Sequence, residues 1–152
     1  MPDRRMSQED ARRVLRQGEY AVLSTAAADG RPYGVPVNYV YVEERQALYF
    51  HCARAGRKLD NLREYPRVSL VVVGCAQVVP DRFITHYDSA LVEGTACELQ
   101  QEDERRAALL LLCQRFSPGV ARRDEVIERY WEAVNLVRVD IQSITGKRNR
   151  DD

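Results

Sequence analysis

The chain has 152 residues, 23 basic and 23 acidic side chains, a formal net charge of zero, and a hydrophobic content of 45%. This composition is too apolar for a disordered protein and fits one folded domain, so we expect residues 1–152 to form a single domain. The charge balance argues against a nucleic-acid partner and gives no electrostatic reason to expect an anionic membrane surface as partner.

Targeting segments and metal sites are not expected either. The first ten residues contain no apolar stretch, and the longest apolar run, residues 107–113, is far shorter than a bilayer span. We therefore expect no secretory signal, no membrane span and a cytoplasmic location. The cysteines stand far apart, and the chain has only two histidines, so we expect no metal site and free, buried thiols. The cysteines are Cys52, Cys75, Cys97 and Cys113.

The first third of the chain is predicted to form one helix and three strands. Ser7, followed three residues later by Asp10, predicts a helix start, and Gly18 is a natural end. Pro36 lies inside the second strand, where proline cannot donate to a ladder, so we expect a sheet edge, a bulge or a bound ligand there. The predicted strands are 20–26, 33–42 and 47–52, with a hairpin turn at 28–31.

The rest of the chain alternates between helices and strands. Pro66 ends a helix, and Gly94 marks a bulge within a strand. Residues 74–88 carry no readable pattern. The predicted elements are a helix at 57–64, a strand at 68–73, a strand at 90–99, helices at 102–116 and 122–131, a last strand at 136–141, and a frayed tail at 147–152.

About six strands with hairpin-like spacing favour an antiparallel sheet. A sheet of this size gains from closing on itself, because closure removes exposed edges. We therefore predict an α+β fold, a small six-stranded antiparallel barrel with flanking helices.

A candidate phosphate site lies at the start of the predicted helix 57–64. Gly56 is followed by Arg57 and Lys58, and cations are unfavourable at a helix N-terminus unless an anion is nearby. The alternative is that both cations are solvated and balanced by Asp60 and Glu64.

Two histidines and a set of aromatic residues are further candidates. His51 ends a strand just before this loop, either as a rim histidine or as a donor to a phosphate or substrate. His86 lies in the unassigned stretch and reads as a surface residue. Several aromatic side chains could line a flat ligand or belong to the core. These are Tyr33, Tyr39, Tyr41, Tyr49, Phe50 and Trp131.

The order and spacing of these segments resemble the FMN-binding split-barrel superfamily that includes pyridoxamine 5′-phosphate oxidase. Within it, the nitroimidazole-resistance branch is the most similar. The likeness runs from about Arg4 to Lys147. The motifs that carry it are Asp29-Gly30-Arg31-Pro32-Tyr33, Val35-Pro36-Val37-Asn38-Tyr39, Tyr49-Phe50-His51-Cys52-Ala53, Gly56-Arg57-Lys58-Leu59-Asp60, Tyr87-Asp88-Ser89-Ala90-Leu91-Val92-Glu93-Gly94 and Ile144-Thr145-Gly146-Lys147.

The resemblance implies a homodimer of split barrels with an FMN at each of two subunit interfaces. It implies a catalytic role for His51 and a partner chain that completes the pocket near residues 87–89 and near Trp131. The cofactor-binding residues that it implies are Val35, Pro36, Val37, Asn38, Tyr49, Phe50, His51, Cys52, Ala53, Arg57, Lys58, Ser89 and Trp131.

The function implied is that of an FMN-dependent oxidoreductase that reduces a small aromatic or nitroaromatic substrate. One alternative is a protein without turnover that stores flavin, senses redox state, or holds haem through His51 or His86. Another is oxidation of a pyridoxamine phosphate, although the chain is shorter than typical oxidases of that kind.

Overall fold

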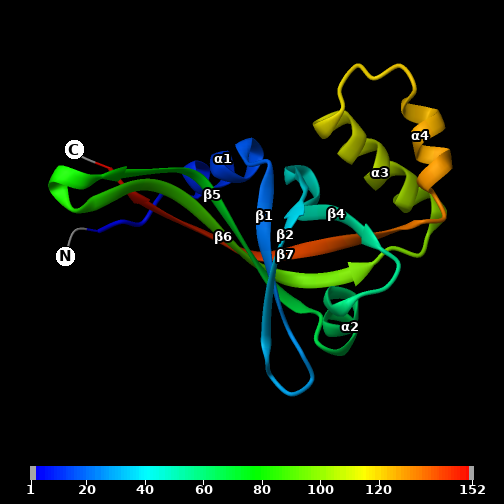
Figure 1. The fold of residues 1–152 in the computed structure, drawn as a ribbon, viewed down its shortest axis with the longest axis horizontal. Coiled ribbons are helices and arrows are strands. Elements are labelled where there is room, and N and C mark those ends of the chain that lie inside the picture. The colour runs from blue at the N-terminus through cyan, green and yellow to red at the C-terminus, as the bar shows by residue number, and fades with distance from the viewer. Residues whose placement is uncertain (1–2, 151–152) are drawn as a thin grey trace.

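A computed structural model describes residues 3–150 and places one seven-stranded antiparallel sheet among four α-helices (Figure 1). The α+β split-barrel prediction is confirmed, with seven strands in place of six. The helices are α1 (Gln8–Gln17), α2 (Arg57–Glu64), α3 (Glu102–Phe116) and α4 (Arg123–Tyr130). The strands are β1 (Tyr20–Ala26), β2 (Pro32–Asn38), β3 (Val40–Val42), β4 (Ala47–Ala53), β5 (Arg67–Val79), β6 (Ile84–Glu98) and β7 (Val134–Asn149).

The sheet is not closed, and the chain between β2 and β3 marks the split. The strand order is β2-β1-β5-β6-β7-β4-β3, so β2 and β3 stand at opposite ends of the order. Only Tyr39 separates them in the chain. The predicted single strand 33–42 is therefore wrong: its first part pairs with β1 and its last part with β4. The expected edge position of Pro36 is confirmed, because β2 has a neighbour on one side only.

Tyr39 changes the course of the chain because its side chain is fixed in the core. The ring is almost fully buried, and its hydroxyl donates a 2.6 Å hydrogen bond to the carbonyl of Leu15 near the end of α1. Burial raises the pKa of Tyr39 well above its usual range. Gly18 must lack a side chain here, since a Cβ would lie 2.5 Å from the Tyr39 hydroxyl.

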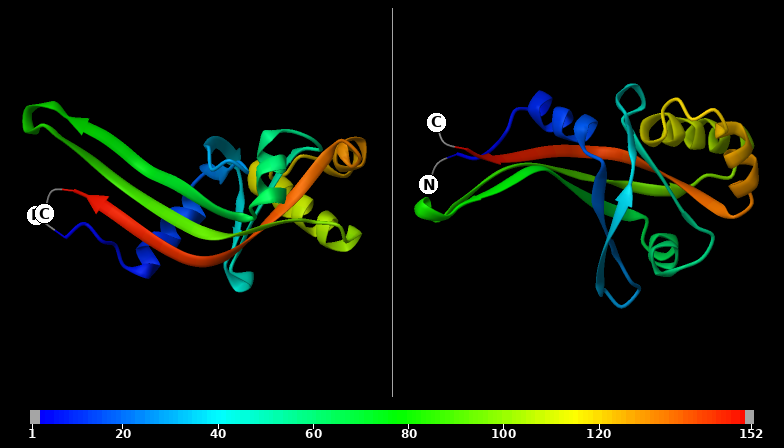
Figure 2. Two further views of the ribbon diagram at one scale, coloured as in Figure 1. Left: turned by 90° about the horizontal axis from the view of Figure 1, so that it is seen from below. Right: turned by 45° about the horizontal axis from the view of Figure 1, so that its top comes forward.

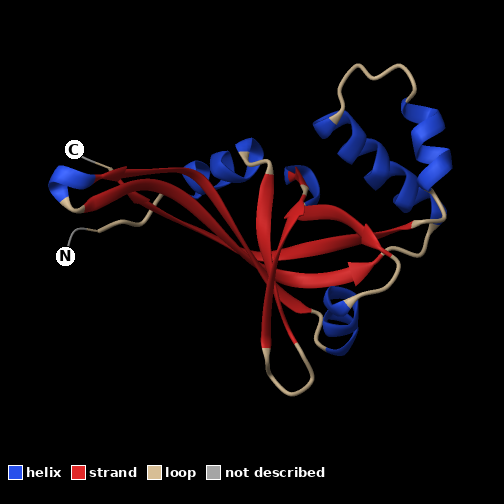
Figure 3. Ribbon diagram, in the orientation of Figure 1, coloured by secondary structure: helices blue, strands red, loops and turns tan. Residues whose placement is uncertain are grey.

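The N-terminal helix forms as predicted and covers the inner face of the sheet. The backbone N–H of Asp10 donates to the Ser7 hydroxyl at 3.1 Å, which confirms the predicted cap. Ala11, Val14 and Leu15 are buried on one side of the helix. They join a core cluster with inward-facing side chains of β1, β5 and β6. Figure 3 shows the helix lying along the long strands of the sheet.

A long arm of three strands extends away from the helices α3 and α4 (Figure 2). Residues 74–88, which the sequence leaves unassigned, form the outer part of the β5–β6 hairpin. The predicted frayed tail is wrong as far as Asn149, because Lys147 pairs with Ser89 in the extended β7. Buried Asp88 holds this end through ion pairs with Arg148 and Arg150. Residues 151–152 of the predicted tail lie outside the described residues.

The predicted irregularity at Gly94 is present, but the extra residue of the bulge is Gln142 of the neighbouring strand β7. The register between β6 and β7 shifts between Glu93 and Gly94, and a Cβ on Gly94 would lie 2.3 Å from the Asp140 carbonyl oxygen. The bulge therefore depends on the close approach of two backbones.

A second core cluster lies between the sheet and the α3–α4 hairpin. Tyr49 of β4 and Leu136 of β7 pack there against Leu109 and Leu112 of α3. Of the four free cysteines, Cys52 is buried, but the expectation of buried thiols is wrong for Cys75 and Cys97, which are exposed. No helix within residues 3–150 is long and apolar enough to cross a membrane.

Candidate functional site

A short turn joins the end of β4 to the start of α2 and leaves the N-terminus of that helix open. Gly56 precedes the helix with φ of 142°, a backbone conformation that favours glycine, and no side chain caps the first turn. The first backbone N–H groups of α2 are therefore available to an anion, and they carry the partial positive charge of the helix end.

Two cations stand at this open helix end. The guanidinium carbon of Arg57 lies 4.3 Å from the centroid of the Tyr33 ring, which belongs to β2. Lys58 is close enough to act electrostatically on His51 and Cys52. Among residues 3–150, neither cation forms an ion pair, so Asp60 and Glu64 do not neutralise them. We call the segment Gly56-Arg57-Lys58 the anion end of the site.

Buried contacts hold α2 in this position. The side chain of Asn61 is buried, and its Nδ2 donates a 2.9 Å hydrogen bond to the Thr25 hydroxyl on β1. Leu59 and Leu62 pack into the main core cluster. The anion end therefore sits on a helix that is fixed to the sheet.

The outer half of β4 is a free sheet edge on one side. β3 pairs only with residues 47–49 of β4, so Phe50–Ala53 have no strand on the side away from β7. The side chains of Tyr49 and Phe50 are fully buried in the two core clusters, and Cys52 is buried as well. Of these predicted cofactor-binding residues, Phe50 and Cys52 can offer a ligand only backbone groups, whereas His51 and Ala53 are exposed. Tyr49 has a paired strand on both sides, so its backbone is not on the free edge.

His51 stands at the mouth of an apolar pocket of about 400 Å³ between β4 and the α3–α4 hairpin. Its imidazole forms no hydrogen bond with another residue in the range 3–150. We call this cavity the His51 pocket. Its lining residues are Asn38, His51, Leu109, Leu112, Cys113, Phe116, Ser117, Val126, Ile127, Tyr130 and Val134.

The electrostatic environment keeps His51 neutral near pH 7. Burial lowers the pKa of His51 from its ordinary value of 6.5, and the positive charge of Lys58 lowers it further. The side chain keeps an open side to solvent, so the burial is partial. A neutral imidazole has one donor and one acceptor nitrogen, and it can therefore hydrogen-bond a ligand in either role.

β2 also borders the His51 pocket, through Asn38. Residues 35–38 form its second half at the sheet edge, with Pro36 opposite Val22 of β1. Asn38 lines the His51 pocket, and its Nδ2 donates a 2.9 Å hydrogen bond to the carbonyl of Glu19, which fixes the amide. Within one chain, Asn38 and His51 line one pocket, Arg57 contacts Tyr33 of β2, and Lys58 lies near His51, so β2, the edge of β4 and the anion end border one region.

Ser89 and Trp131 lie elsewhere in the chain. Ser89 belongs to β6 at the base of the arm, opposite Val73. Trp131 follows α4, and the guanidinium carbons of Arg105 and Arg106 lie 4.8 and 4.6 Å from its ring centroid. Trp131 lines a separate polar pocket with Arg54, so it does not face the His51 pocket of its own chain.

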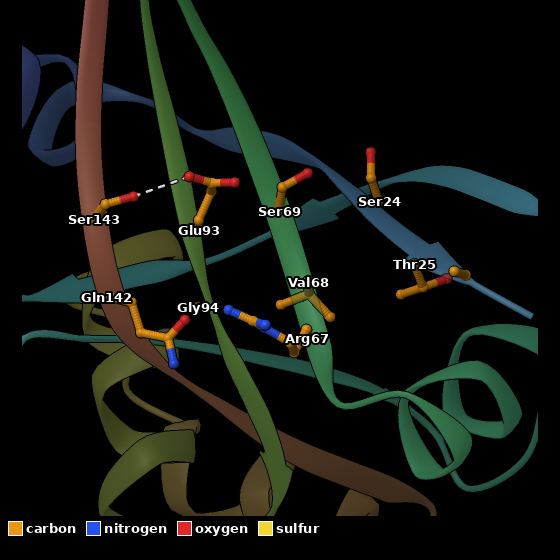
Figure 4. A pocket seen from close by; sticks show the side chains of 10 residues that line it. Ser24, Thr25, Arg67, Val68, Ser69, Glu93, Gly94, Gln142 and Ser143 are labelled. Carbon is orange, nitrogen blue, oxygen red and sulfur yellow. Dashed lines mark hydrogen bonds between the residues drawn. The ribbon is translucent and has the colours of Figure 1, made fainter. Parts of the chain in front are cut away.

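A larger, polar cavity of about 530 Å³ opens on the outer face of the sheet (Figure 4). Ser143 of β7 donates a 3.1 Å hydrogen bond to Glu93 of the neighbouring strand β6, and Ser24 and Thr25 of β1 lie on the other side of the cavity. None of the predicted cofactor-binding residues lines it. Although this cavity is larger than the His51 pocket, the His51 pocket is therefore the candidate site.

The sequence did not reveal the helical side of the His51 pocket. Eight of its lining residues come from α3, α4 and the loop between them. The sequence did contain an indication of this apolar wall, because the apolar run 107–113 covers more than one side of α3. Leu109 and Leu112 of that helix pack in the second core cluster and also line the pocket, together with Cys113 and Phe116.

Known proteins share this architecture. A FAD-binding protein from Mesorhizobium loti is 25% identical, with a TM-score of 0.70 over 97% of this chain and 98% of that chain. A FAD- and haem-binding protein from Mycobacterium smegmatis is 21% identical, with a TM-score of 0.78 over 99% and 77%. A candidate 5-nitroimidazole antibiotic resistance protein from Bacteroides thetaiotaomicron VPI-5482 is 20% identical, with a TM-score of 0.76 over 94% and 85%.

Two comparisons of the sequence itself gave different results. No curated protein matches the chain. The family model described as pyridoxamine 5′-phosphate oxidase matches residues 7–148, which is nearly the whole chain. The chain therefore belongs to the pyridoxamine 5′-phosphate oxidase family.

Proposed function

We propose that the protein binds FMN beside the free edge of β4 and acts as an oxidoreductase on a small aromatic or nitroaromatic substrate. The observation that carries this proposal is the juxtaposition of a cationic helix start with a neutral histidine at the mouth of an apolar pocket. The phosphate of FMN fits the first part, and a small aromatic substrate fits the second.

The donor set fits a flavin mononucleotide from end to end. Lys58, Arg57 and the uncapped N–H groups of α2 would hold the phosphate. The backbone of Phe50–Ala53, which has no neighbouring strand, and residues 35–37 of β2 would lie along the ring. A flavin bound there supplies hydride and single-electron transfer, and the protein supplies position and hydrogen bonds.

His51 and the pocket would perform the protein's part of the reaction. The neutral imidazole would hydrogen-bond a polar atom of the substrate and orient it. The apolar walls of α3 and α4 would exclude water from the reacting atoms, which strengthens polar interactions inside the pocket.

The partner in this proposal is a second copy of the chain. Val22, Val71 and Leu91 are paired across β1, β5 and β6, so they share the outer face of the sheet, and Val22 and Leu91 are exposed there. Tyr20 and Val73 extend this apolar patch. An isologous dimer would cover the patch on both copies and bring the partner's Ser89 and the partner's Trp131 toward the flavin.

Haem binding is the second candidate function, and His51 favours it. A neutral imidazole in an apolar pocket is a suitable axial ligand for haem iron. Non-catalytic storage or redox sensing would use the same pocket, and oxidation of a pyridoxamine phosphate is the remaining alternative.

A reduction and reoxidation cycle tests the enzymatic part of the proposal. The FMN-loaded protein is mixed anaerobically with a reduced nicotinamide donor, and nitrobenzene is then added. We expect loss of the flavin absorption band at about 450 nm in the first step and its return in the second. A flavin that cannot be reduced, or that is not reoxidised faster by nitrobenzene than by buffer, would leave the protein as a flavin carrier.

A further inference from the structure

The walls of the His51 pocket carry no formal charge. Its eleven lining residues include neither an acidic residue nor lysine or arginine. Its polar groups are the amide of Asn38, the hydroxyls of Ser117 and Tyr130, the thiol of Cys113 and the imidazole of His51. Burial raises the pKa of the Cys113 thiol, so this group is also neutral at pH 7.

The cations nearest to the pocket are engaged or lie outside it. Arg123 is close enough to Cys113 to act on its thiol, but it is not a lining residue, and its Nε lies 3.9 Å from Asp124. Lys58 is close to His51 but belongs to the anion end, where the proposed flavin phosphate would occupy it. Inside the pocket, a phosphate would lose its hydration without gaining a cation.

We infer that the His51 pocket selects an uncharged ring compound and rejects a phosphorylated one, with the α3–α4 hairpin as the specificity element. This inference rests on the proposed function, because it assigns the pocket to the substrate. It also separates the chain from the reaction that gives its family its name, since pyridoxamine 5′-phosphate carries a phosphate dianion. A volume of about 400 Å³ suits a single ring with short substituents.

A matched pair of ligands tests the inference. 4-Nitrobenzyl alcohol and 4-nitrobenzyl phosphate share one ring and differ in the phosphate. Each is titrated calorimetrically into the purified protein, with its bound cofactor, at pH 7.5. We expect the alcohol to bind at least about tenfold more tightly than the phosphate, because an ion transferred into an apolar site without a partner is strongly disfavoured.

A charge placed at the rim should change this preference. Tyr130 lines the pocket and is 48% exposed, so Tyr130→Arg is expected to fold. It should raise the affinity for the phosphate relative to that for the alcohol at least about fivefold. Tyr65→Arg is the matched control, because Tyr65 is also 48% exposed and lies outside the pocket. Phe116→Arg, at the other side of the rim, gives an independent second variant.

Each outcome decides the inference. Equal or tighter binding of the phosphate by the unmodified protein, or no binding of the alcohol, would overturn it. The same gain in phosphate affinity with Tyr65→Arg as with Tyr130→Arg would also overturn it. The absorption spectrum of the same sample reports the flavin separately. Discrimination without bound flavin would contradict the proposed function alone, whereas bound flavin without discrimination would contradict only the pocket assignment.

Discussion

The guanidinium carbon of Arg57 lies 4.3 Å from the centroid of the Tyr33 ring, so a cation at the start of α2 rests on a side chain of β2. The contact joins two residues that are 24 positions apart in the chain. It holds the Arg57 charge at the anion end without neutralising it, because an aromatic ring attracts a cation and carries no formal charge.

Tyr33→Leu removes this support from Arg57. We expect the FMN dissociation constant to rise by about two- to fivefold, since an exposed cation–π contact contributes about 0.5–1 kcal/mol. Flavin fluorescence titration measures the change. In an Arg57→Ala background, Tyr33→Leu should have no further effect, and an unchanged loss there would show that Tyr33 acts on flavin binding by another route.

Lys58→Ala should weaken FMN binding by roughly 10- to 100-fold, because a charge-assisted hydrogen bond to a phosphate contributes about 1.5–3 kcal/mol. Arg63→Ala is the matched control, since Arg63 lies on the same helix and pairs with Glu98 at 2.5 Å, away from the open helix end. An affinity in Lys58→Ala equal to that of the unmodified protein would remove Lys58 from the site.

His51 should make stability depend on pH. Its pKa is lowered in the folded protein, so as the pH falls below about 6.5 the unfolded chain binds a proton first. The free energy of unfolding should therefore be highest above this pH and decrease as the pH falls toward the lower, folded-state pKa. Urea unfolding between pH 7.5 and 5 measures the effect. His51→Gln should flatten this part of the curve, and His86→Gln should retain it; identical curves for the unmodified protein and His51→Gln would contradict the assignment.

Gly94→Ala should destabilise the protein by about 1–3 kcal/mol, because the new Cβ would lie 2.3 Å from the Asp140 oxygen and 2.9 Å from Val139 Cγ1. Gly34→Ala is the control, since the nearest atom to its Cβ is 3.6 Å away, and we expect a change within about 0.5 kcal/mol. Urea unfolding midpoints compare the two. Equal midpoints would show that the backbones of β6 and β7 adjust at the bulge without cost.

Local chemistry explains which elements the sequence could predict. The Ser7 cap, the Gly30 turn with φ of 84°, and the α2 start at Arg57 depend on a few neighbouring residues, and all three form as expected. The local sequence pattern does not indicate that residues 74–88 and the end of β7 form strands. Their strands exist because β5, β6 and β7 pair along the arm, and Asp88 finds its arginine partners only after 60 and 62 residues.

The candidate site was predictable in part for the same reason. The anion end is one continuous segment, so Gly56, Arg57 and Lys58 could be recognised together. The His51 pocket is made by side chains more than 50 residues away on α3 and α4, and nothing near His51 in the sequence indicates them. The split between β2 and β3 was hidden as well, because it follows from their pairing with different strands, β1 and β4.

The visible absorption spectrum of the purified protein, with the mass of the released cofactor, tests the central claim most directly. The proposed site predicts two broad flavin bands and the mass of FMN, and it predicts that Lys58→Ala is purified with less of both. A strong Soret band would assign the His51 pocket to haem instead. A colourless protein that takes up no added FMN would contradict the flavin site altogether.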